Sequence, residues 1–118
     1  MREQFSGADS GNSTSTYNSS AAEASKVVKA TPGKLFLVAC SNGTASTVYL
    51  QVFNSTTVPA DATVPVLVVP CPANGVGEID LSEYDGHAFS TGIAICGSTT
   101  QNTKTLGGAS FLFHVRYK

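Results

Sequence analysis

The stretch that decides the fold is residues 109–117, Ala-Ser-Phe-Leu-Phe-His-Val-Arg-Tyr, near the end of the chain. Within it, large apolar side chains at Phe111, Phe113, Val115 and Tyr117 alternate with Leu112, His114 and Arg116. Successive side chains of a β-strand point to opposite faces, so this alternation predicts a strand that turns its aromatic face toward a core. The stretch therefore predicts a β-domain.

Two further runs upstream have the same character. Residues 34–40 are apolar at both alternating sets of positions, which is typical of a central strand. Residues 47–54 place Val48, Leu50 and Val52 on one face. The Ser-Asn-Gly-Thr segment at 41–44 predicts a hairpin turn, which would make the two strands antiparallel neighbours.

The rest of the chain after residue 26 adds short strands separated by turn signals. Residues 64–69 are apolar with Pro65 and Pro70 near the ends, which predicts a strand at a sheet edge. Shorter apolar segments lie at 27–28, 76–81 and 91–96, and polar segments at 54–63 and 97–108 predict loops. The pattern has no helical period, so we expect an all-β fold, an antiparallel β-sandwich or jelly roll of six to eight strands.

Residues 1–25 differ from everything that follows. Nine of them are Ser or Thr. Such a segment buries too little apolar surface to offset the entropy of ordering its backbone. We expect an extended N-terminal arm over residues 1–25 that binds another chain, followed by a β-sandwich domain over residues 26–118. The predicted partner-binding residues of the arm are Met1, Arg2, Gln4, Phe5 and Tyr17.

Charge and hydropathy exclude several classes of partner. Charged residues make up 13% of the chain and its net charge is −1, against about 25% charged residues in ordinary soluble domains. A weakly charged surface is inexpensive to desolvate in an interface and does not attract nucleic acid. No apolar run approaches the ~20 residues that span a bilayer. The first residues lack a secretory signal, so we expect synthesis in the cytoplasm and no membrane partner.

Few residues could support catalysis. His114 lies on the face of its strand opposite the aromatics and is expected to face solvent or an interface, and His87 follows a turn at Asp85-Gly86. No nucleophile motif is present, so we predict that the protein is not an enzyme and has no catalytic residue or cofactor. Three cysteines lie at irregular spacing and are interpreted as buried, reduced apolar residues: Cys40, Cys71 and Cys96.

Two other features of the sequence are candidate ligand sites, a cluster of carboxylates and an aromatic residue in a loop. Four carboxylates gather between residues 78 and 85, at Glu78, Asp80, Glu83 and Asp85. Calcium favours oxygen-rich loops, but the spacing does not match a helix-flanked calcium loop, so we interpret the cluster as a solvated turn and predict no metal site. The chain has no Trp, which leaves Tyr84 as the aromatic platform to test for sugar binding.

A pattern of turns and core positions runs through residues 26–118. It comprises Lys29-Ala-Thr-Pro-Gly-Lys-Leu-Phe36, Val48-Tyr-Leu-Gln-Val-Phe53, Val64-Pro-Val66, Ile79-Asp-Leu81, Phe89-Ser-Thr-Gly-Ile93 and Ser98-Thr-Thr100. This pattern resembles small β-sandwich virion proteins of tailed bacteriophages, including capsid decoration (cement) proteins and related tail components. The resemblance implies a sandwich that forms trimers at threefold or quasi-threefold positions of a capsid, with extensions that clamp neighbouring capsid subunits.

The arm and the resemblance lead to one expected function. An arm of 25 residues extends to at most ~90 Å, enough to cross a subunit boundary. We expect a non-enzymatic virion protein on the capsid surface, a cement protein that binds the major capsid protein and forms a homo-oligomer, with a trimer favoured. The alternative is a tail, baseplate or fibre module that contacts the host surface, including through a glycan.

Overall fold

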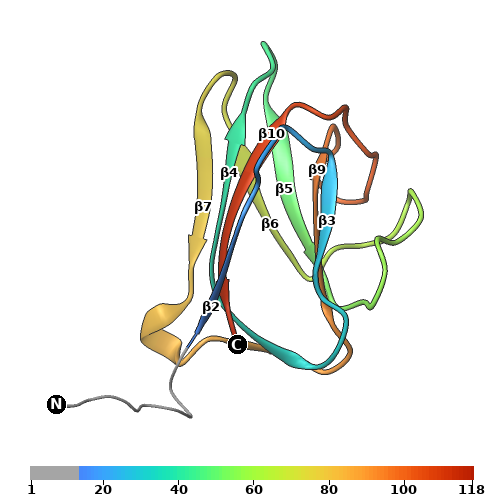
Figure 1. Ribbon diagram of the computed structural model, residues 1–118. Coiled ribbons are helices and arrows are strands. Elements are labelled where there is room, and N and C mark those ends of the chain that lie inside the picture. The colour runs from blue at the N-terminus through green and yellow to red at the C-terminus, as the bar shows by residue number, and fades with distance from the viewer. Residues whose placement is uncertain (1–13) are drawn as a thin grey trace, which may run out of the picture.

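The computed structural model describes residues 14–118, which form two antiparallel β-sheets packed face to face (Figure 1). The five-stranded sheet has the order β2-β10-β4-β7, with β8 paired to β4. Its strands are β2 (Ser15–Asn18), β4 (Gly33–Asn42), β7 (Val76–Asp80), β8 (His87–Phe89) and β10 (Phe111–Tyr117). The four-stranded sheet has the order β3-β9-β5-β6. Its strands are β3 (Ser25–Lys29), β5 (Val48–Phe53), β6 (Leu67–Cys71) and β9 (Ile93–Ser98).

The predicted all-β sandwich is confirmed, and residues 14–118 contain nine strands where six to eight were expected. The two additional elements are β2 and β8, which are four and three residues long. Neither has the run of alternating apolar residues that marks the longer strands. Strand β2 pairs with β10, and β8 pairs with β4. Because backbone hydrogen bonds hold these short strands, the pattern of their side chains does not reveal them.

The core lies between the sheets and is built from the inward faces that alternation predicts. On β10, Phe111, Phe113 and Val115 are buried while Leu112 and His114 are exposed, as the sequence indicates. The opposite layer contributes buried residues of β5 and β9, including Leu50 and Ile95. Full burial of each such side chain stabilises the fold by about 1.5–3 kcal/mol.

Two predictions about strand position are confirmed. Strand β4 lies between β10 and β7, as expected for a strand that is apolar on both faces. Strand β6 lies at the edge of the four-stranded sheet, as its prolines indicate. The strand itself begins three residues later than expected, at Leu67, and it includes Pro70, which lies opposite Tyr49.

The predicted hairpin between residues 34–40 and 47–54 is wrong. Strands β4 and β5 belong to different sheets, so the turn between them crosses from one layer to the other. The reason is Asn42, whose buried side chain donates to the carbonyls of Ser46, Cys71 and Pro72 at 2.9, 3.1 and 3.1 Å. Its Oδ1 accepts from the backbone N and the hydroxyl of Thr44. These bonds fasten the turn to the end of β6 instead of closing a ladder between β4 and β5.

The described part of the predicted arm, residues 14–25, is attached to the sandwich. Strand β2 pairs with β10, with Tyr17 opposite Val115. Further on, the backbone N of Glu23 donates to the carbonyl of Phe111 at 2.9 Å. Because backbone pairing needs no apolar pattern, the polar composition of this segment did not reveal it. Within the described residues the sandwich begins at Ser15, eleven residues before the expected start at residue 26.

Candidate functional site: an open sheet face

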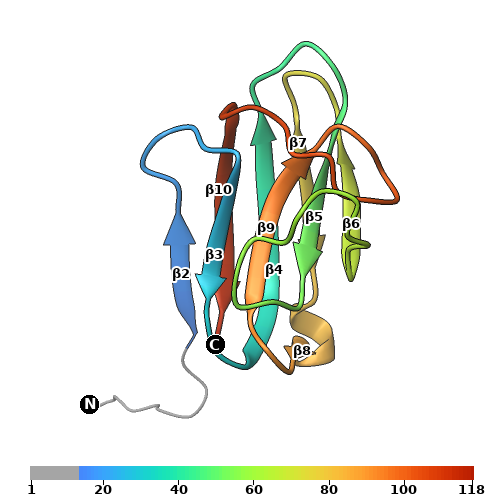
Figure 2. The same cartoon turned by 90° about the vertical axis from the view of Figure 1, so that its right-hand side faces the viewer.

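The outer face of the four-stranded sheet is covered by the chain's own loops. Phe53, Ala94 and Cys96 point away from the main core and form a second buried cluster. The connections 54–66 and 99–110 pass over this face, and Figure 2 shows both crossing in front of the sheet. Together, loops 54–66 and 99–110 are called the loop layer. The loop layer makes this side of the protein a third layer of the fold.

The loop layer is held to the sheet by buried polar groups. Gln51 of β5 is buried, and its Nε2 donates to the carbonyls of Thr100, Gln101 and Thr103 at 2.9, 3.1 and 3.1 Å. The buried Ser98 hydroxyl donates to the carbonyl of Thr100 at 2.8 Å. Buried polar groups are stable only when they are hydrogen-bonded, so these contacts fix one loop conformation.

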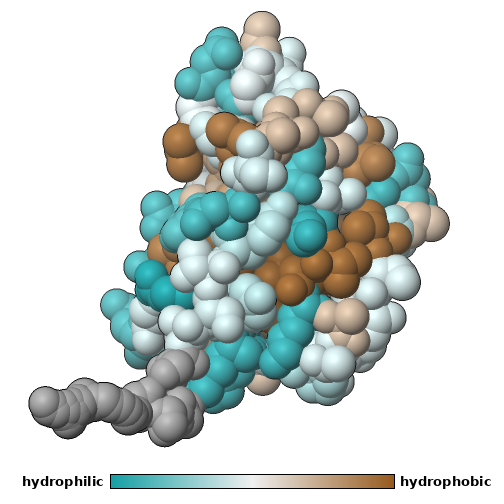
Figure 3. All heavy atoms as spheres, viewed as in Figure 1, coloured by the Kyte–Doolittle hydropathy of each residue, from teal (hydrophilic) through white to brown (hydrophobic). Residues whose placement is uncertain are grey.

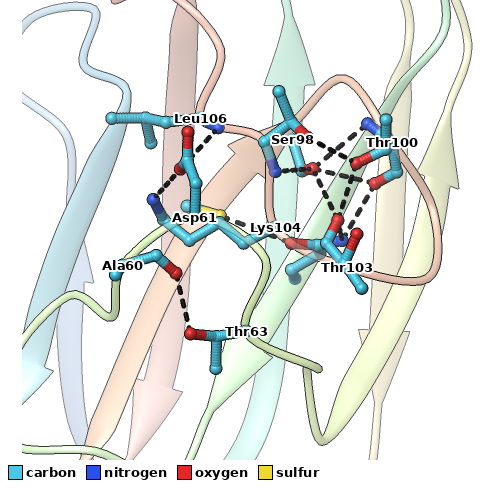
Figure 4. A network of polar contacts seen from close by, with 11 residues as sticks. Ala60, Asp61, Thr63, Ser98, Thr100, Thr103, Lys104 and Leu106 are labelled. Carbon is cyan, nitrogen blue, oxygen red and sulfur yellow. Dashed lines mark hydrogen bonds and ion pairs between the residues drawn. The ribbon is translucent and has the colours of Figure 1, made fainter.

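The two loops of the layer are also bonded to each other (Figure 4). Lys104 is only 4% exposed, and its Nζ lies 2.7 Å from Asp61 Oδ1. The backbone N of Ala62 donates to the carbonyl of Lys104, and the N of Lys104 to the carbonyl of Thr63, at 2.7 and 2.8 Å. No local pattern predicts this pair. The one available signal is that Asp61 and Lys104 are the single charged residues of their two polar loops.

Replacing Asp61 with alanine is expected to open the loop layer. The ammonium of Lys104 would stay buried without its carboxylate, which is costly, so the loops should separate from the sheet more often. Cys96 lies beneath them, and burial raises the pKa of its thiol to about 11. We expect labelling of Cys96 by a thiol reagent in the native protein to accelerate by about tenfold or more.

Acidification should act in the same direction. The Lys104 ammonium, followed by the backbone N of Leu106, donates to Asp61 and lowers the pKa of its carboxyl. A lowered folded-state pKa contributes stability that is complete above about pH 4 and is lost as the pH falls through the lowered pKa.

Asp61→Asn is the control for the Asp61→Ala variant, because its side chain keeps an oxygen that accepts from the backbone N of Leu106. Labelling of Cys96 at the wild-type rate in Asp61→Ala would show that the pair does not hold the layer closed.

The outer face of the five-stranded sheet is arranged differently. Its outward side chains on β10, β4 and β7 are called the open face, and Val76 and Leu112 on it are 58% and 48% exposed. The open face consists of Leu112, His114, Arg116, Leu37, Ala39, Ser41, Val76, Glu78 and Asp80. One sheet thus has a covered outer face, and the other presents its side chains to solvent.

The strand register orders the open face into rows across the sheet. His114, Ala39 and Glu78 form one row, and Arg116, Leu37 and Asp80 form the next. Basic groups therefore stand on β10 and acidic groups on β7, with small or half-buried apolar side chains between them on β4. The pKa of the Asp80 carboxyl is lowered mainly because the backbone N and the hydroxyl of Ser82 donate to it. The positive charge of Arg116 lowers this pKa by a smaller amount.

Exposed apolar residues concentrate on two parts of the surface. Among residues 14–118, two of the six large exposed hydrophobic residues, Val76 and Leu112, lie on the open face. The other four are Val64, Val66 and Leu106 of the loop layer and Val68 of the adjoining edge strand β6. Figure 3 shows that much of one side of the molecule is polar or weakly hydrophobic, with apolar residues gathered in separate patches. Patches of this kind mark surfaces that contact other molecules.

Of the predicted partner-binding residues, Met1, Arg2, Gln4 and Phe5 lie outside the described residues, so their role stays a prediction. Tyr17 is half-buried against the core. Its hydroxyl donates to the Glu23 carboxylate, which raises the pKa of the tyrosine, and the Lys26 ammonium lies 4.8 Å from the ring centroid. In this position Tyr17 fastens β2 to its own sandwich.

The residues weighed for catalysis or ligand binding make local contacts. The His87 ring packs against Phe89 in a tilted arrangement, with centroids 5.0 Å apart and 48° between the ring planes, and His114 bonds to Asn18 on the neighbouring strand. Their strands, β8 and β10, pair with β4 from opposite sides. Asp85 forms an exposed ion pair with Lys34 at 3.1 Å.

Residues 14–118 contain no group of three or more His, Cys, Asp or Glu side chains placed to hold a metal ion. They also contain no helix long and apolar enough to cross a membrane. The side chain of Tyr84 lies outside the part of the chain that the structure describes. Comparisons with protein families, with curated proteins and with solved structures found no match for this chain.

Proposed function

We propose that this chain is a non-enzymatic structural protein of a tailed-phage virion, a capsid decoration protein that binds the major capsid protein through its arm and its open face. The observation that carries the proposal is the asymmetry of the sandwich. One outer face is closed by the loop layer, whereas the other exposes Leu112 and Val76 beside the rows that carry His114, Arg116, Glu78 and Asp80. Exposed apolar side chains bordered by polar and charged ones are typical of surfaces that bind other proteins.

The position of the arm supports the same proposal. Ser15, at the start of β2, lies opposite Tyr117 at the end of β10. Residues 1–13 are therefore joined through Thr14 to the edge strand beside the open face, and at full extension these 13 residues span at most ~45 Å. A partner seated on the open face would be within reach of Met1, Arg2, Gln4 and Phe5. Repeated engagement of many copies, arranged as trimers, would convert weak contacts into durable attachment.

Replacing Leu112 with glutamate is expected to weaken binding to capsids by at least about tenfold, because a carboxylate would have to be buried at an apolar contact. Binding is measured by co-sedimentation of the purified protein with undecorated capsids of the phage that encodes it. Leu106→Glu is the matched control, since Leu106 is similarly exposed, at 41% against 48%, but belongs to the loop layer. Deletion of residues 2–13 should also reduce binding and leave the described sandwich folded.

Wild-type binding by both Leu112→Glu and the deletion variant would overturn the proposal. Loss of binding in Leu106→Glu alone would place the contact on the covered side instead. Labelling of the protein in assembled virions separates the head from the tail. A regular distribution over the head supports decoration, and label confined to the tail supports the tail, baseplate or fibre alternative.

A further inference from the structure

Cys40 and Cys71 come from opposite sheets and meet inside the core. Cys40 belongs to β4 of the five-stranded sheet and Cys71 to β6 of the four-stranded sheet. Both side chains are fully buried and both are free thiols. The chain separates them by thirty residues, so their proximity is a product of the tertiary fold alone.

Gly77 shows how closely the two cysteines approach. Gly77 of β7 is the cross-strand partner of Cys40, and side chains at such positions lie about 5 Å apart at Cβ. A Cβ added to Gly77 would lie 2.5 Å from Cys71 Sγ and 3.3 Å from Cys71 Cα. The sulfur of Cys71 therefore fills the space beside Cys40 that the glycine leaves empty. Asn42 holds this arrangement, because its side chain donates to the Cys71 carbonyl at 3.1 Å.

We propose that Cys40 and Cys71 form an oxidation site, at which a disulfide oxidant such as oxidised glutathione joins the two sheets through a Cys40–Cys71 bond. In the first step one thiolate of the pair attacks the oxidant, forms a mixed disulfide and releases one glutathione thiolate. The other cysteine, after losing its proton, then attacks the protein sulfur of the mixed disulfide and releases the second glutathione. The protein loses two protons and two electrons, and the oxidant disulfide is reduced to two thiols.

The two thiols influence each other's titration. Bonding between them lowers the pKa of Cys71 and, together with burial, raises the pKa of Cys40. Cys96 cannot replace either residue, since it lies on the other side of the four-stranded sheet under the loop layer and faces Gln51. It serves as an internal control.

The experiment is refolding of the full-length protein from urea in a buffer of reduced and oxidised glutathione, so that access of the oxidant to the core is not limiting. We expect a product lighter by two hydrogen atoms, with peptides containing Cys40 and Cys71 linked and Cys96 free in mass mapping. Closing a loop of this length should raise the Tm by about 10 °C or more. Cys96→Ser should behave identically.

Three outcomes would overturn the inference. These are a folded product that keeps all three thiols, a linkage that includes Cys96, or a cross-linked product with a Tm below that of the reduced protein. Cys40→Ala and Cys71→Ala should each lose the linkage. The mapping of the wild-type protein decides the question even if either variant fails to fold.

Discussion

Replacing Asn42 with alanine is expected to lower the free energy of unfolding by about 3 kcal/mol. Its side chain is buried and makes five hydrogen bonds, three as a donor to backbone carbonyls and two as an acceptor from Thr44. Alanine would leave the carbonyls of Cys71 and Pro72 without this donor where β4 passes to the other sheet. Equilibrium urea unfolding measures the change.

Asn54→Ala is the matched control for Asn42. Asn54 also bonds to three groups, on Ser90, Thr91 and Gly92, but it is exposed and water can replace it. We expect this variant to lose at most about 1 kcal/mol. Equal losses at the two positions would show that the crossing between sheets does not depend on Asn42. Asn42→Asp should remain strongly destabilising, since it keeps the acceptor but removes every donor and adds a buried charge.

Replacing Gly97 with alanine should also destabilise the protein by about 3 kcal/mol, at the upper end of the range for overpacked cores. A Cβ at Gly97 would lie 2.5 and 2.7 Å from Cδ2 and Cζ of the Phe111 ring, and closer still to Cε2. That ring is fully buried, and a Cβ on Gly107 would lie 3.1 Å from its Cε2 and Cζ, so both glycines pack closely against the same edge of the ring. The methyl group therefore has to displace either β9 or β10. Thermal unfolding measures the loss.

The chain offers a matched glycine for comparison. The nearest atom to a Cβ on Gly108 is the Ser110 hydroxyl at 3.9 Å, so Gly108→Ala should change the stability by less than about 0.5 kcal/mol. Combining Gly97→Ala with Phe111→Leu tests the cause directly. If the clash with the ring is responsible, the double variant should lose less stability than the sum of the two single losses. Additive losses would contradict this explanation.

Much of the fold follows from local patterns in the sequence. The alternation in residues 111–117 predicts which side chains of β10 are buried. Pro65 and Pro70 predict that β6 is an edge strand. The burial of all three cysteines follows from their apolar character. Alternation and proline chemistry act within a few residues, so a single segment is enough to reveal them.

Less of the candidate site could be predicted. The outward positions of Leu112 and His114 follow from alternation, but the exposure of that face depends on which sheet receives a loop layer. Two polar loops with one charge each appeared unstructured, although Asp61 and Lys104 join them over a buried cluster. The energy of that pairing arises only when segments distant in the chain meet.

The sequence by itself determined the all-β class, the central and edge strands and the inward face of β10, because a two-residue period and the missing N–H of proline are properties of the local chain. Only the tertiary structure decided that β4 and β5 lie in different sheets, that β2 completes the five-stranded sheet, and that Cys40 meets Cys71. Backbone pairing and the bonds of Asn42 join segments far apart in the chain, and neither leaves a periodic pattern along it.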